Sequence, residues 1–450
     1  MASRKKIAIV GFGKEGVATA NYFSKSGELF IFDKKPKEEI NPEILKKLKF
    51  TNVGFFTMDN IPAVNFDLVV RTPGIRTDDP ILNRLAKNGA RRTSHIKIFF
   101  DKCPAQIIGV TGTKGKGTTA TLIYEMLKTR SHNVYLAGNI GTPALEILPK
   151  LNKNSNVILE LSSFQLMDLK KSPHVAVVLM VTSEHLDWHV DNGEYLSAKA
   201  NIVKFQNRSD YAVINADYPN SLKIAKFAKS KIYQVSTRGK IKGTYFQNGY
   251  IYSNIIKPEK IINADEIQLP GKHNIQNAMA AISVARILGI STANIKQVLT
   301  TFKGLKHRLQ LVAVKNGVRY YNDSYSTTPE TAIAALNAFA CPKTIILGGS
   351  GKNSDFSTLA KTIANDHQLK AIILIGSEAP KIKSAIQKSG GFKGSLFENL
   401  KSMKDIVKTA AKISQKGEVV ILSPACASFD MFKNYADRGE QFEKEVKLLK

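Results

Sequence analysis

The stretch Gln106-Ile-Ile-Gly-Val-Thr-Gly-Thr-Lys-Gly-Lys-Gly-Thr-Thr119 runs from an apolar strand into a glycine-rich turn. Glycines in such a turn let successive backbone N–H groups converge on an anion, and the positive end of a following helix strengthens the attraction. A helical pattern follows over residues 120–128, and Lys116 supplies a cation for the β- and γ-phosphates. The stretch therefore predicts a phosphate-binding loop between a strand and a helix of an α/β sheet.

This turn departs from the strict pattern G-x-x-x-x-G-K-[ST] at both ends. Val110 stands where the first glycine is expected, and Gly117 stands where the magnesium-binding hydroxyl is expected. The candidates for that hydroxyl are therefore Thr118 and Thr119. The nucleotide contacts predicted for the loop are Gly112, Thr113, Lys114, Gly115, Lys116, Gly117, Thr118 and Thr119.

The composition indicates a soluble protein of several domains, because 450 residues are too many for one core. The sequence has no span of about 18 uncharged apolar residues, so we expect no membrane insertion. The net charge of +28 is spread along the chain without a nucleic-acid-binding motif, which favours a solvated basic surface or anionic small substrates over nucleic acid. Three separated cysteines without C-x-x-C spacing argue against disulfides and zinc, and favour the cytoplasm.

Near the N-terminus, residues 6–33 form the pattern strand, glycine-rich turn, helix, strand, which predicts a Rossmann-like βαβ unit. Asp33 stands where a dinucleotide enzyme holds a ribose, so NAD is one candidate ligand. The same glycines also occur where a helix merely packs closely on a strand, and the pattern leaves both readings open. A later strand ends in the turn Thr72-Pro-Gly74, a usual ligand position in an open parallel sheet.

In the second segment, polar residues follow two strands beside the predicted phosphate loop. Glu160, at the end of the strand over 156–160, is either a metal ligand or a charge at a strand edge. The strand over 175–182 leads into Ser183-Glu-His-Leu-Asp-Trp-His189, where zinc binding competes with helix capping and packing, and no further cysteine or histidine follows at ligand spacing. Lys199, in the predicted helix over 194–202, is by default a surface lysine.

The remaining chain predicts a further helix and a third alternating segment. Asn274 and Asn277 lie near a helix start, where they either face a base or cap the helix. Later apolar runs end in small-residue loops, as expected of parallel strands covered by helices. We predict an α/β protein of three domains: a Rossmann-like domain over residues 1–97, a P-loop ATPase-type domain with a parallel or mixed sheet over 98–302, and a Rossmann-like domain over 303–450.

Ten motifs recur together in this chain: Thr111-Gly-Thr-Lys-Gly-Lys116, Gly138-Asn-Ile-Gly141, Glu160-Leu-Ser-Ser-Phe-Gln-Leu166, Glu184-His-Leu-Asp187, Ala198-Lys-Ala200, Pro270-Gly-Lys-His-Asn274, His307-Arg308, Asn322-Asp-Ser324, Leu347-Gly-Gly-Ser-Gly-Lys352 and Leu422-Ser-Pro-Ala-Cys-Ala-Ser-Phe-Asp-Met-Phe-Lys-Asn-Tyr-Ala-Asp-Arg-Gly439. Together they resemble the Mur ligase family, and most closely its D-glutamate-adding members. The resemblance covers nearly the whole chain.

The resemblance implies an ATP-dependent acid–D-amino-acid ligase. Such an enzyme activates the carboxylate of UDP-N-acetylmuramoyl-L-alanine as an acyl phosphate and joins it to D-glutamate, with release of ADP and phosphate. The implied setting is cytoplasmic peptidoglycan precursor synthesis, and with it cell wall biogenesis, cell shape and cell division. The implied cofactors are ATP and two magnesium ions, and the implied form is a monomer.

The resemblance also implies roles for individual residues, with UDP in place of NAD on the first domain. The catalytic residues would be Lys116, Glu160, His185 and Lys199. The metal ligands would be Thr118, Glu160, His185 and Lys199, the last as a carbamate. Further ATP contacts would come from Asn274, Asn277, Arg308 and Asp323. The UDP-linked substrate would contact Asp33, Thr72, Pro73, Gly74 and Asn139, and D-glutamate would contact Thr327, Lys352, Ser428, Phe429 and Tyr435.

One departure bears on the amino acid that is added. Tyr325 stands where D-glutamate-adding members usually have a lysine that pairs with the incoming carboxylate. A sibling Mur or folylpolyglutamate-type ligase, with a different amino acid or acceptor, is therefore an alternative. A nucleotide-dependent binding protein with a degenerate site is a further alternative.

Overall fold

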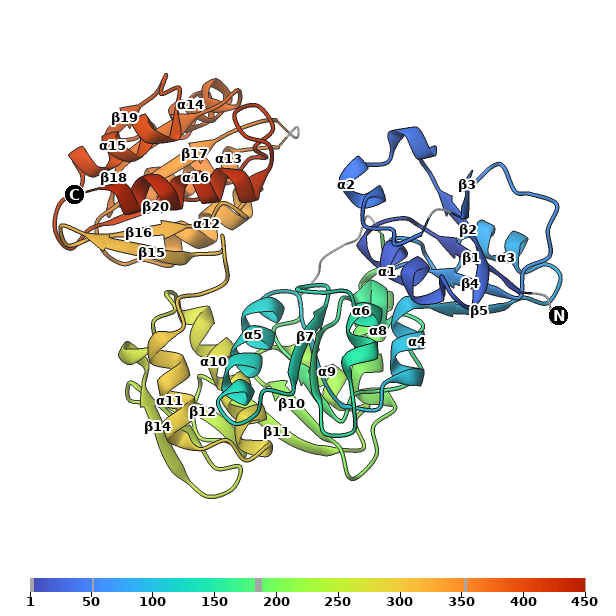
Figure 1. Ribbon diagram of the computed structural model, residues 1–450. Coiled ribbons are helices and arrows are strands. Elements are labelled where there is room, and N and C mark those ends of the chain that lie inside the picture. The colour runs from blue at the N-terminus through green and yellow to red at the C-terminus, as the bar shows by residue number, and fades with distance from the viewer. Residues whose placement is uncertain (1–3, 51, 183–187, 352–353, 450) are drawn as a thin grey trace. The chain divides into compact units, whose positions relative to one another are not determined.

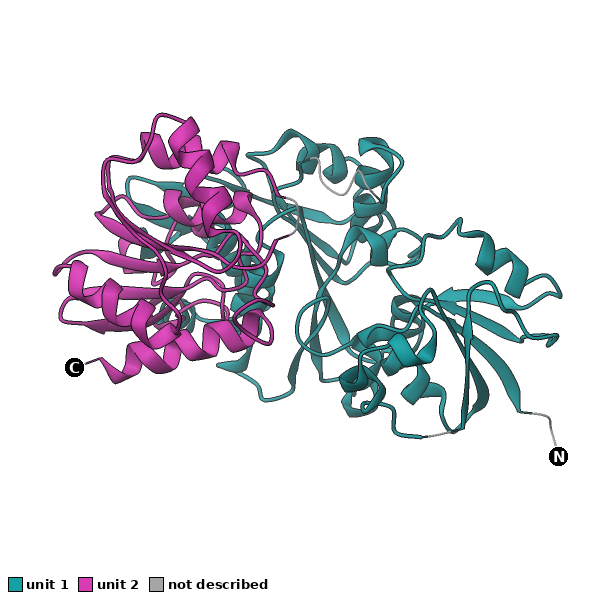
Figure 2. Ribbon diagram, turned by 90° about the horizontal axis from the view of Figure 1, so that it is seen from above, with its two compact units in different colours: residues 1–264, 276–298 teal, residues 265–275, 299–450 magenta. Residues whose placement is uncertain are grey.

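The computed structural model describes residues 4–50, 52–182, 188–351 and 354–449. The predicted site residues His185 and Lys352 lie outside these ranges. Three sheets follow one another along the described chain, in blue, in green to yellow, and in orange to red in Figure 1. The chain divides into two compact units, Met1–Ala264 with Gln276–Val298 and Asp265–Ile275 with Leu299–Lys450 (Figure 2).

The first sheet has the strand order β3-β2-β1-β4-β5, and all neighbouring strands are parallel. The chain builds outward from β1 on one side and then returns to build outward on the other, so the topological switch point lies between β1 and β4. This is the predicted Rossmann-like arrangement. The elements are β1 (Lys5–Val10), α1 (Lys14–Phe23), β2 (Gly27–Asp33), η1 (Lys37–Glu39), α2 (Pro42–Leu45), β3 (Val53–Thr57), β4 (Leu68–Arg71), α3 (Pro80–Leu85), β5 (Arg91–Ser94) and α4 (His95–Lys102).

Both faces of β1 are buried. Successive side chains of a strand point to opposite sides of the sheet, and alternate residues of β1 belong to two different core clusters. Ile7 and Ile9 of β1 belong to a core cluster that also holds residues of α1 and α4. Ala8 and Val10 belong to a second cluster that also holds residues of α3. A strand covered on both faces must be apolar at every position, which explains the run that predicted β1.

The central sheet has the order β14-β13-β12-β11-β10-β9-β6-β8-β7, parallel from β7 to β12 and antiparallel over its last two pairs. Its strands are β6 (Gln106–Thr111), β7 (Val134–Gly138), β8 (Asn156–Glu160), β9 (Val175–Val178), β10 (Tyr211–Asn215), β11 (Lys231–Ser236), β12 (Gly243–Gln247), β13 (Tyr250–Ser253) and β14 (Glu259–Asn263). Because β6 lies between β8 and β9, their carboxyl ends meet at one edge of the sheet.

Helices and 3₁₀ turns connect these strands: α5 (Lys116–Lys128), α6 (Ala144–Ile147), η2 (Leu148–Lys150), α7 (Ser163–Leu166), α8 (Asn192–Lys204), α9 (Pro219–Ala225), η3 (Ala264–Glu266), α10 (Lys272–Ile287) and α11 (Thr292–Thr301). The core cluster beneath the first sheet continues into the central sheet, where Val157 and Leu159 of β8 are fully buried. The first and central sheets therefore share one core within the first compact unit.

The third sheet has the order β15-β16-β20-β17-β18-β19, with only the β15–β16 pair antiparallel among the described strands. Its elements are β15 (Gln310–Lys315), β16 (Val318–Asn322), α12 (Pro329–Asn337), β17 (Lys343–Gly348), α13 (Ser357–Asn365), β18 (Leu369–Ile375), α14 (Ala379–Lys388), β19 (Ser395–Phe397), α15 (Met403–Ile413), β20 (Val419–Leu422) and α16 (Tyr435–Leu448). Ile345 packs in a cluster with residues of α12, α13 and α14, whereas its neighbour Ile346 packs with α15 and α16. Helices therefore cover both faces.

The predicted domain and helix boundaries can be compared with the observed helices. The predicted domain limit at residue 97 lies within α4, and the limit at residue 302 directly follows α11; both domain limits stay predictions. Helix α5 begins at Lys116, four residues earlier than its sequence pattern indicated. None of the described helices is both long and apolar enough to cross a membrane.

Candidate active site

The predicted phosphate loop joins β6 to α5 and depends on glycine at two positions. Gly112 and Gly115 have positive φ angles of +157° and +86°, a region in which residues with a Cβ are strained. A Cβ on Gly115 would lie 2.2 Å from Oδ1 of Asn277 in α10. Glycine therefore both shapes the loop and lets the Asn277 amide approach it.

Two lysines converge on one oxygen of this loop. The Nζ of Lys116 donates to the carbonyl oxygen of Gly112 at 3.0 Å, and the Nζ of Lys199 donates to the same oxygen at 2.9 Å. Lys116 also donates to the carbonyl oxygen of Thr113 at 3.1 Å. Two positive charges this close repel each other and attract an anion. The arrangement suits a site where phosphate is bound.

Lys199 is buried, with 2% of its surface exposed, although its sequence pattern indicated a surface lysine. It lies on α8, and its Nζ is 3.4 Å from Oγ1 of Thr111 and 4.6 Å from the centre of the Tyr195 ring. The Tyr195 hydroxyl is 2.9 Å from Oγ1 of Thr113 in the phosphate loop. Helix α8 is thus fastened to the loop by several contacts around Lys199.

Glu160, the last residue of β8, is buried at the same edge of the sheet. Its Oε1 accepts a hydrogen bond of 2.9 Å from Nδ2 of Asn139, and its carbonyl oxygen accepts one of 3.0 Å from the Asn139 backbone N–H. This approach requires glycine at position 138, where a Cβ would lie 2.4 Å from the Glu160 carbonyl oxygen. A candidate metal ligand and a candidate substrate contact are therefore neighbours.

The donor set at this edge fits magnesium. Thr118 and Thr119 lie in the first turn of α5 and are buried, and among the described residues the Thr119 hydroxyl finds no hydrogen-bond partner. Magnesium prefers oxygen ligands and is commonly held by one or two carboxylates together with substrate phosphates and water. Glu160 and a threonine hydroxyl are ligands of this kind. The predicted ligand His185 lies outside the described residues.

His189, weighed above as a zinc ligand, has both ring nitrogens in contact with protein groups. Its Nδ1 is 3.1 Å from Oε2 of Glu194, and its Nε2 is 2.9 Å from Oγ of Ser163. With the proton on Nδ1, facing Glu194, Nε2 of the neutral ring accepts a hydrogen bond from the Ser163 hydroxyl. These contacts support the packing interpretation of His189.

At the carboxyl edge of the first sheet, Asp33 and Thr72 lie on either side of the turn that follows β1. Oδ2 of Asp33 accepts from the N–H of Phe12 at 2.7 Å, and Oγ1 of Thr72 donates to the carbonyl oxygen of Val10 at 3.0 Å. A Cβ on Gly11 would lie 2.2 Å from Oγ1 of Thr72. This place is the topological switch point, where open α/β sheets bind ligands. The half-buried Pro73 and the exposed Gly74 follow directly.

In the second compact unit, Asp323 follows β16 and is buried. Its Oδ1 accepts from the N–H of Leu309 at 3.0 Å, and its Oδ2 accepts from Oγ of Ser423 at 2.8 Å. Burial raises the pKa of the Asp323 carboxyl to about 7, against the opposing effect of these hydrogen bonds and of Arg308. The guanidinium carbon of Arg308 lies 4.7 Å from the centre of the Tyr325 ring.

The other predicted contacts of this unit gather at the carboxyl ends of β16, β17 and β20. Tyr435, the first residue of α16, meets the Tyr325 ring edge-on at 5.2 Å between centroids. Ser428 is buried, Phe429 is exposed, and the Phe429 N–H donates to Oγ of Ser350 at 3.1 Å. Thr327 is half-buried in the loop after β16.

Asn274, a predicted ATP contact, lies in the first turn of α10 rather than at these strand ends. Its Nδ2 donates to the carbonyl oxygen of Pro270 at 2.6 Å.

Known proteins resemble this chain over nearly its whole length. Three family models match: MurD-like N-terminal domain over residues 5–93, Mur ligase middle domain over 110–285, and Mur ligase glutamate ligase domain over 307–426. The UDP-N-acetylmuramoylalanine–D-glutamate ligase of Clostridium tetani is 37% identical over 451 residues, 99% of this chain and 97% of that protein. The ligase of the same name from Geobacillus sp. is 37% identical over 454 residues, 99% and 98% of the two chains.

The chain belongs to the Mur ligase family.

Solved Mur ligase structures share the fold. The UDP-N-acetylmuramate–alanine ligase MurC of Thermotoga maritima superposes with a TM-score of 0.61 at 18% identity, covering 98% of this chain and 99% of that one. The MurF ligase of the same organism, solved in complex with ADP, superposes with a TM-score of 0.57 at 19% identity, covering 99% and 96%. The predicted three-domain α/β fold is thereby confirmed.

Arg438 is a residue of this Mur ligase that the sequence patterns did not single out. It is fully buried, and its guanidinium donates to Oγ and the carbonyl oxygen of Ser324, both at 2.9 Å. It also donates to the carbonyl oxygens of Ala427 at 3.1 Å and Cys426 at 3.2 Å. One side chain thus holds together the loops after β16 and β20. Its only signal in the sequence was its place in the motif that ends at Gly439.

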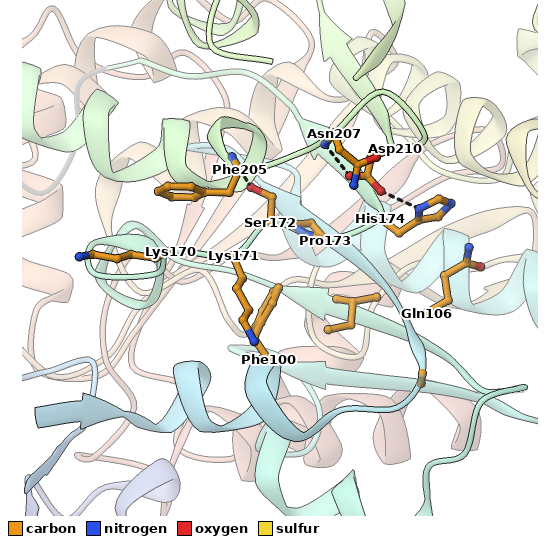
Figure 3. Close-up of a pocket in the computed structure, with 12 residues that line it drawn as sticks. Phe100, Gln106, Lys170, Lys171, Ser172, Pro173, His174, Phe205, Asn207 and Asp210 are labelled. Atoms are coloured by element: carbon orange, nitrogen blue, oxygen red, sulfur yellow. Dashed lines mark hydrogen bonds and ion pairs between the residues drawn. The ribbon is translucent and has the colours of Figure 1, made fainter. Parts of the chain in front are cut away.

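A separate cavity of about 350 Å³ lies at the opposite end of the central strands (Figure 3). Gln106, His174 and Asp210, which line it, lie at or just before the starts of β6, β9 and β10. Nδ1 of His174 and Oδ1 of Asp210 are hydrogen-bonded at 2.8 Å. None of the described site residues lines this cavity. Open α/β sheets bind substrates at their carboxyl ends, so this cavity is not the predicted Mur ligase site.

The raised pKa of Asp323 leads to a pH-dependent stability. The carboxyl stays protonated in the folded protein up to about pH 7, whereas in the unfolded chain it ionises near the ordinary aspartate pKa of 3.8. The folded state therefore binds more protons between about pH 4 and pH 7, and its stability falls as the pH rises through this window. We expect the free energy of unfolding of wild type, relative to Asp323→Asn, to fall by a few kcal/mol at most across this window.

Guanidinium unfolding followed by circular dichroism at intervals from pH 5 to pH 8 measures this difference. Asparagine retains an acceptor for the Leu309 N–H but cannot ionise. The exposed Glu330→Gln in α12 is the matched control, and its profile should follow the wild type. Parallel profiles for wild type and Asp323→Asn would contradict the prediction.

Proposed function

We infer that this Mur ligase adds D-glutamate to UDP-N-acetylmuramoyl-L-alanine in an ATP-dependent reaction of peptidoglycan precursor synthesis. The observation that carries the inference is the 37% identity, over 99% of the chain, to ligases named for that reaction. The arrangement of the described residues supports it, because Lys116, Lys199 and Glu160 lie at the joined carboxyl ends of the central strands. The reaction is expected in the cytoplasm and in a monomer.

The first chemical step transfers a phosphoryl group. A carboxylate oxygen of the L-alanyl group attacks the γ-phosphorus of ATP, the bond to the β,γ-bridging oxygen breaks, and ADP leaves. The product is an acyl phosphate. Both reactants are anions, so positioning and charge neutralisation carry most of the catalysis.

The phosphate loop supplies the charges for this step. Lys116 exchanges its contacts with the Gly112 and Thr113 carbonyl oxygens for the phosphate oxygens of the nucleotide. The backbone N–H groups at the start of α5 face the same anion. Glu160 and a hydroxyl of Thr118 or Thr119 would hold magnesium, which would supply positive charge against the charge that develops on the phosphate. Asn277, which borders Gly115, is a candidate contact for the adenine.

The acceptor is placed by the first sheet and by the loop that carries Asn139. Thr72 and Asp33 border the switch point, where the uridine would bind. Asn139 is hydrogen-bonded to Glu160, so an acceptor group that contacts this amide lies beside the metal ligand. The L-alanyl carboxylate is thereby directed toward the γ-phosphate.

The second step forms the amide. The neutral amine of D-glutamate attacks the acyl carbon, the tetrahedral intermediate expels phosphate, and the proton lost by the nitrogen passes to the departing phosphate or to water. Thr327, Ser428, the backbone of Phe429 and Tyr435 are the described candidates for binding D-glutamate. Lys352, the remaining candidate, lies outside the described residues.

Lys199 is proposed to act as a carbamate. The Lys199 ammonium first loses a proton to solvent; the neutral amine then adds to carbon dioxide and releases a second proton, so that an anion with two oxygen atoms replaces a cation. The buried position of Lys199 beside the Gly112 carbonyl supports this role, because the change replaces repulsion between two lysines with attraction. The carbamate oxygens then suit magnesium.

Tyr325 favours a second candidate, a sibling ligase that adds another amino acid, because the expected lysine is missing. The structure offers a replacement for that charge. Arg308 holds its guanidinium over the Tyr325 ring, a favourable cation–π contact. This contact puts a positive charge beside Tyr325, and we retain D-glutamate because the relatives that match 99% of the chain are ligases named for that amino acid.

A panel of amino acids distinguishes the two candidates. With UDP-N-acetylmuramoyl-L-alanine, ATP and magnesium, we expect phosphate release with D-glutamate and at least about a hundredfold lower kcat/KM with L-glutamate, D-aspartate, L-lysine and glycine, since unpaired charges in the site penalise the wrong side chain. Phosphate release and the mass of the ligated product are the measurements. Strict preference for another amino acid would establish the sibling ligase, and no release with any of them would contradict ligase activity.

A further inference from the structure

Arg71, which belongs to none of the motifs, is almost completely buried at the end of β4. One of its terminal nitrogens donates to the carbonyl oxygens of Thr72 at 3.5 Å and Ile75 at 3.0 Å. The other donates to the carbonyl oxygen of Phe164 at 3.0 Å and to Oδ1 of Asp168 at 2.6 Å. A guanidinium has five N–H donors in a rigid plane, and four of them are used here.

These four contacts join two parts of the proposed acceptor site. Thr72 to Ile75 is the turn after β4, at the switch point of the first sheet. Phe164 belongs to α7, which begins three residues after Glu160 at the carboxyl end of β8. A single rigid side chain therefore links the turn proposed to hold the uridine to the helix beside the proposed metal ligand.

A second buried contact links the same parts. Glu15 lies in the first turn of α1, directly after the glycine-rich turn of the first sheet, and its Oε1 accepts from Nε2 of Gln165 in α7 at 2.5 Å. Oε1 of Gln165 in turn accepts from the N–H of Ser162 at 2.9 Å, which fixes the amide. Among the described residues, Oε2 of Glu15 and Nε of Arg71 are both buried without a hydrogen-bond partner. Burial raises the pKa of the Glu15 carboxyl to about 7, against the opposing effects of the Gln165 hydrogen bond and of the charge of Arg71.

We propose that Arg71 is a positioning residue for the acceptor, holding the turn from Thr72 to Ile75 at a fixed place relative to α7 and Glu160. The proposal rests on the proposed function, because it assigns the turn to the UDP-linked substrate. The acceptor spans from this turn to the γ-phosphate. If this turn can move, fewer of the enzyme–acceptor complexes hold the L-alanyl carboxylate against the γ-phosphorus. A misplacement of the carboxylate by about 1 Å lowers the rate on the order of a hundredfold.

The test compares binding of the two substrates to Arg71→Met, which keeps an unbranched apolar side chain but removes all the donors. Calorimetry with UDP-N-acetylmuramoyl-L-alanine alone should give a Kd about tenfold or more above wild type, and its KM should rise similarly. The KM for ATP should stay within about twofold. The substitution does not leave the Asp168 carboxylate buried without a counter-charge, because this side chain is partly exposed and Nζ of Lys97 lies 3.9 Å from its Oδ2.

The exposed Arg91→Met, on the neighbouring strand β5, is the matched control and should leave both substrate affinities at their wild-type values. Asp168→Asn provides a milder variant if Arg71→Met does not fold. It removes the ion pair at a partly exposed position, and we expect the acceptor Kd to rise about threefold.

The outcomes separate the two proposals. A lower unfolding temperature with unchanged acceptor Kd and KM in the folded variant would reduce Arg71 to a structural role, as would equal effects on ATP and acceptor. A wild-type protein that binds no UDP-N-acetylmuramoyl-L-alanine would instead overturn the proposed function. Acceptor binding by wild type, weakened selectively in Arg71→Met or Asp168→Asn, supports the positioning role.

Discussion

Replacing Lys116 by alanine should lower kcat by about a thousandfold or more, the largest single effect expected in this protein. Lys116 is the flexible cation at the start of α5, and it already reaches the carbonyl oxygens of the phosphate loop. Its removal leaves the transferred phosphoryl group without that charge in the transition state. Phosphate release at saturating substrate concentrations measures the effect.

Lys128→Ala is the matched control for this experiment. Lys128 is the last residue of the same helix, is exposed, and lies 5.1 Å from the Tyr124 ring. Its removal should leave turnover within about twofold of wild type. A loss of less than about tenfold in Lys116→Ala would show that the loop does not hold the reacting phosphates, and would favour the degenerate nucleotide-binding alternative.

Replacing Lys199 by alanine should lower kcat by about a hundredfold or more, and short carboxylic acids should restore part of the loss. The substitution removes both the ammonium near Gly112 and the carbamate proposed to form from it. Formate or acetate can enter the space left by the side chain and offer the oxygen atoms that the carbamate would provide. Activity measured against increasing acid concentration should therefore rise to a plateau.

Rescue separates this role from simple packing. Lys204→Ala, at the exposed end of the same helix, should keep wild-type activity and show no response to the acids. Unchanged activity in Lys199→Ala would exclude the ligand role. A stable but inactive variant that no acid rescues would instead assign the loss to the missing ammonium and its contacts with the phosphate loop.

The fold was predictable because its signals are local. The apolar runs that form β1, β6 and β8 are short and continuous, as strands covered on both faces must be, and each ends in a glycine or a polar residue. The phosphate loop was predicted for the same reason. The start of α5 was placed too late because Gly115 and Gly117 are poor helix formers. The bond from the Thr119 N–H to the Gly115 carbonyl oxygen nevertheless closes the first turn.

The residues of the candidate site could be predicted from the sequence only where they belong to a motif. The burial of Lys199 depends on Tyr195 and the Gly112 carbonyl, and the latter lies 87 residues away in the sequence. Arg71 and Asp168 are 97 residues apart and carry no pattern of their own. The sequence around a charged residue does not show which distant residues will surround it, so a charged residue that becomes buried cannot be told from one that stays on the surface. The predicted domain limits remain to be tested by fragments.

The two carbonyl contacts of Lys116 have a consequence for how the loop chooses its nucleotide. The ammonium has already exchanged part of its hydration for neutral oxygen atoms before any nucleotide arrives. When a nucleotide binds, the Lys116 ammonium exchanges neutral carbonyl acceptors for a similar number of charged phosphate oxygens. Hydrogen bonds between ions are roughly twice as strong as neutral ones. Adenosine has no phosphate to replace these carbonyl oxygens as acceptors, so we expect the loop, in its proposed role, to favour nucleotides that carry a polyphosphate.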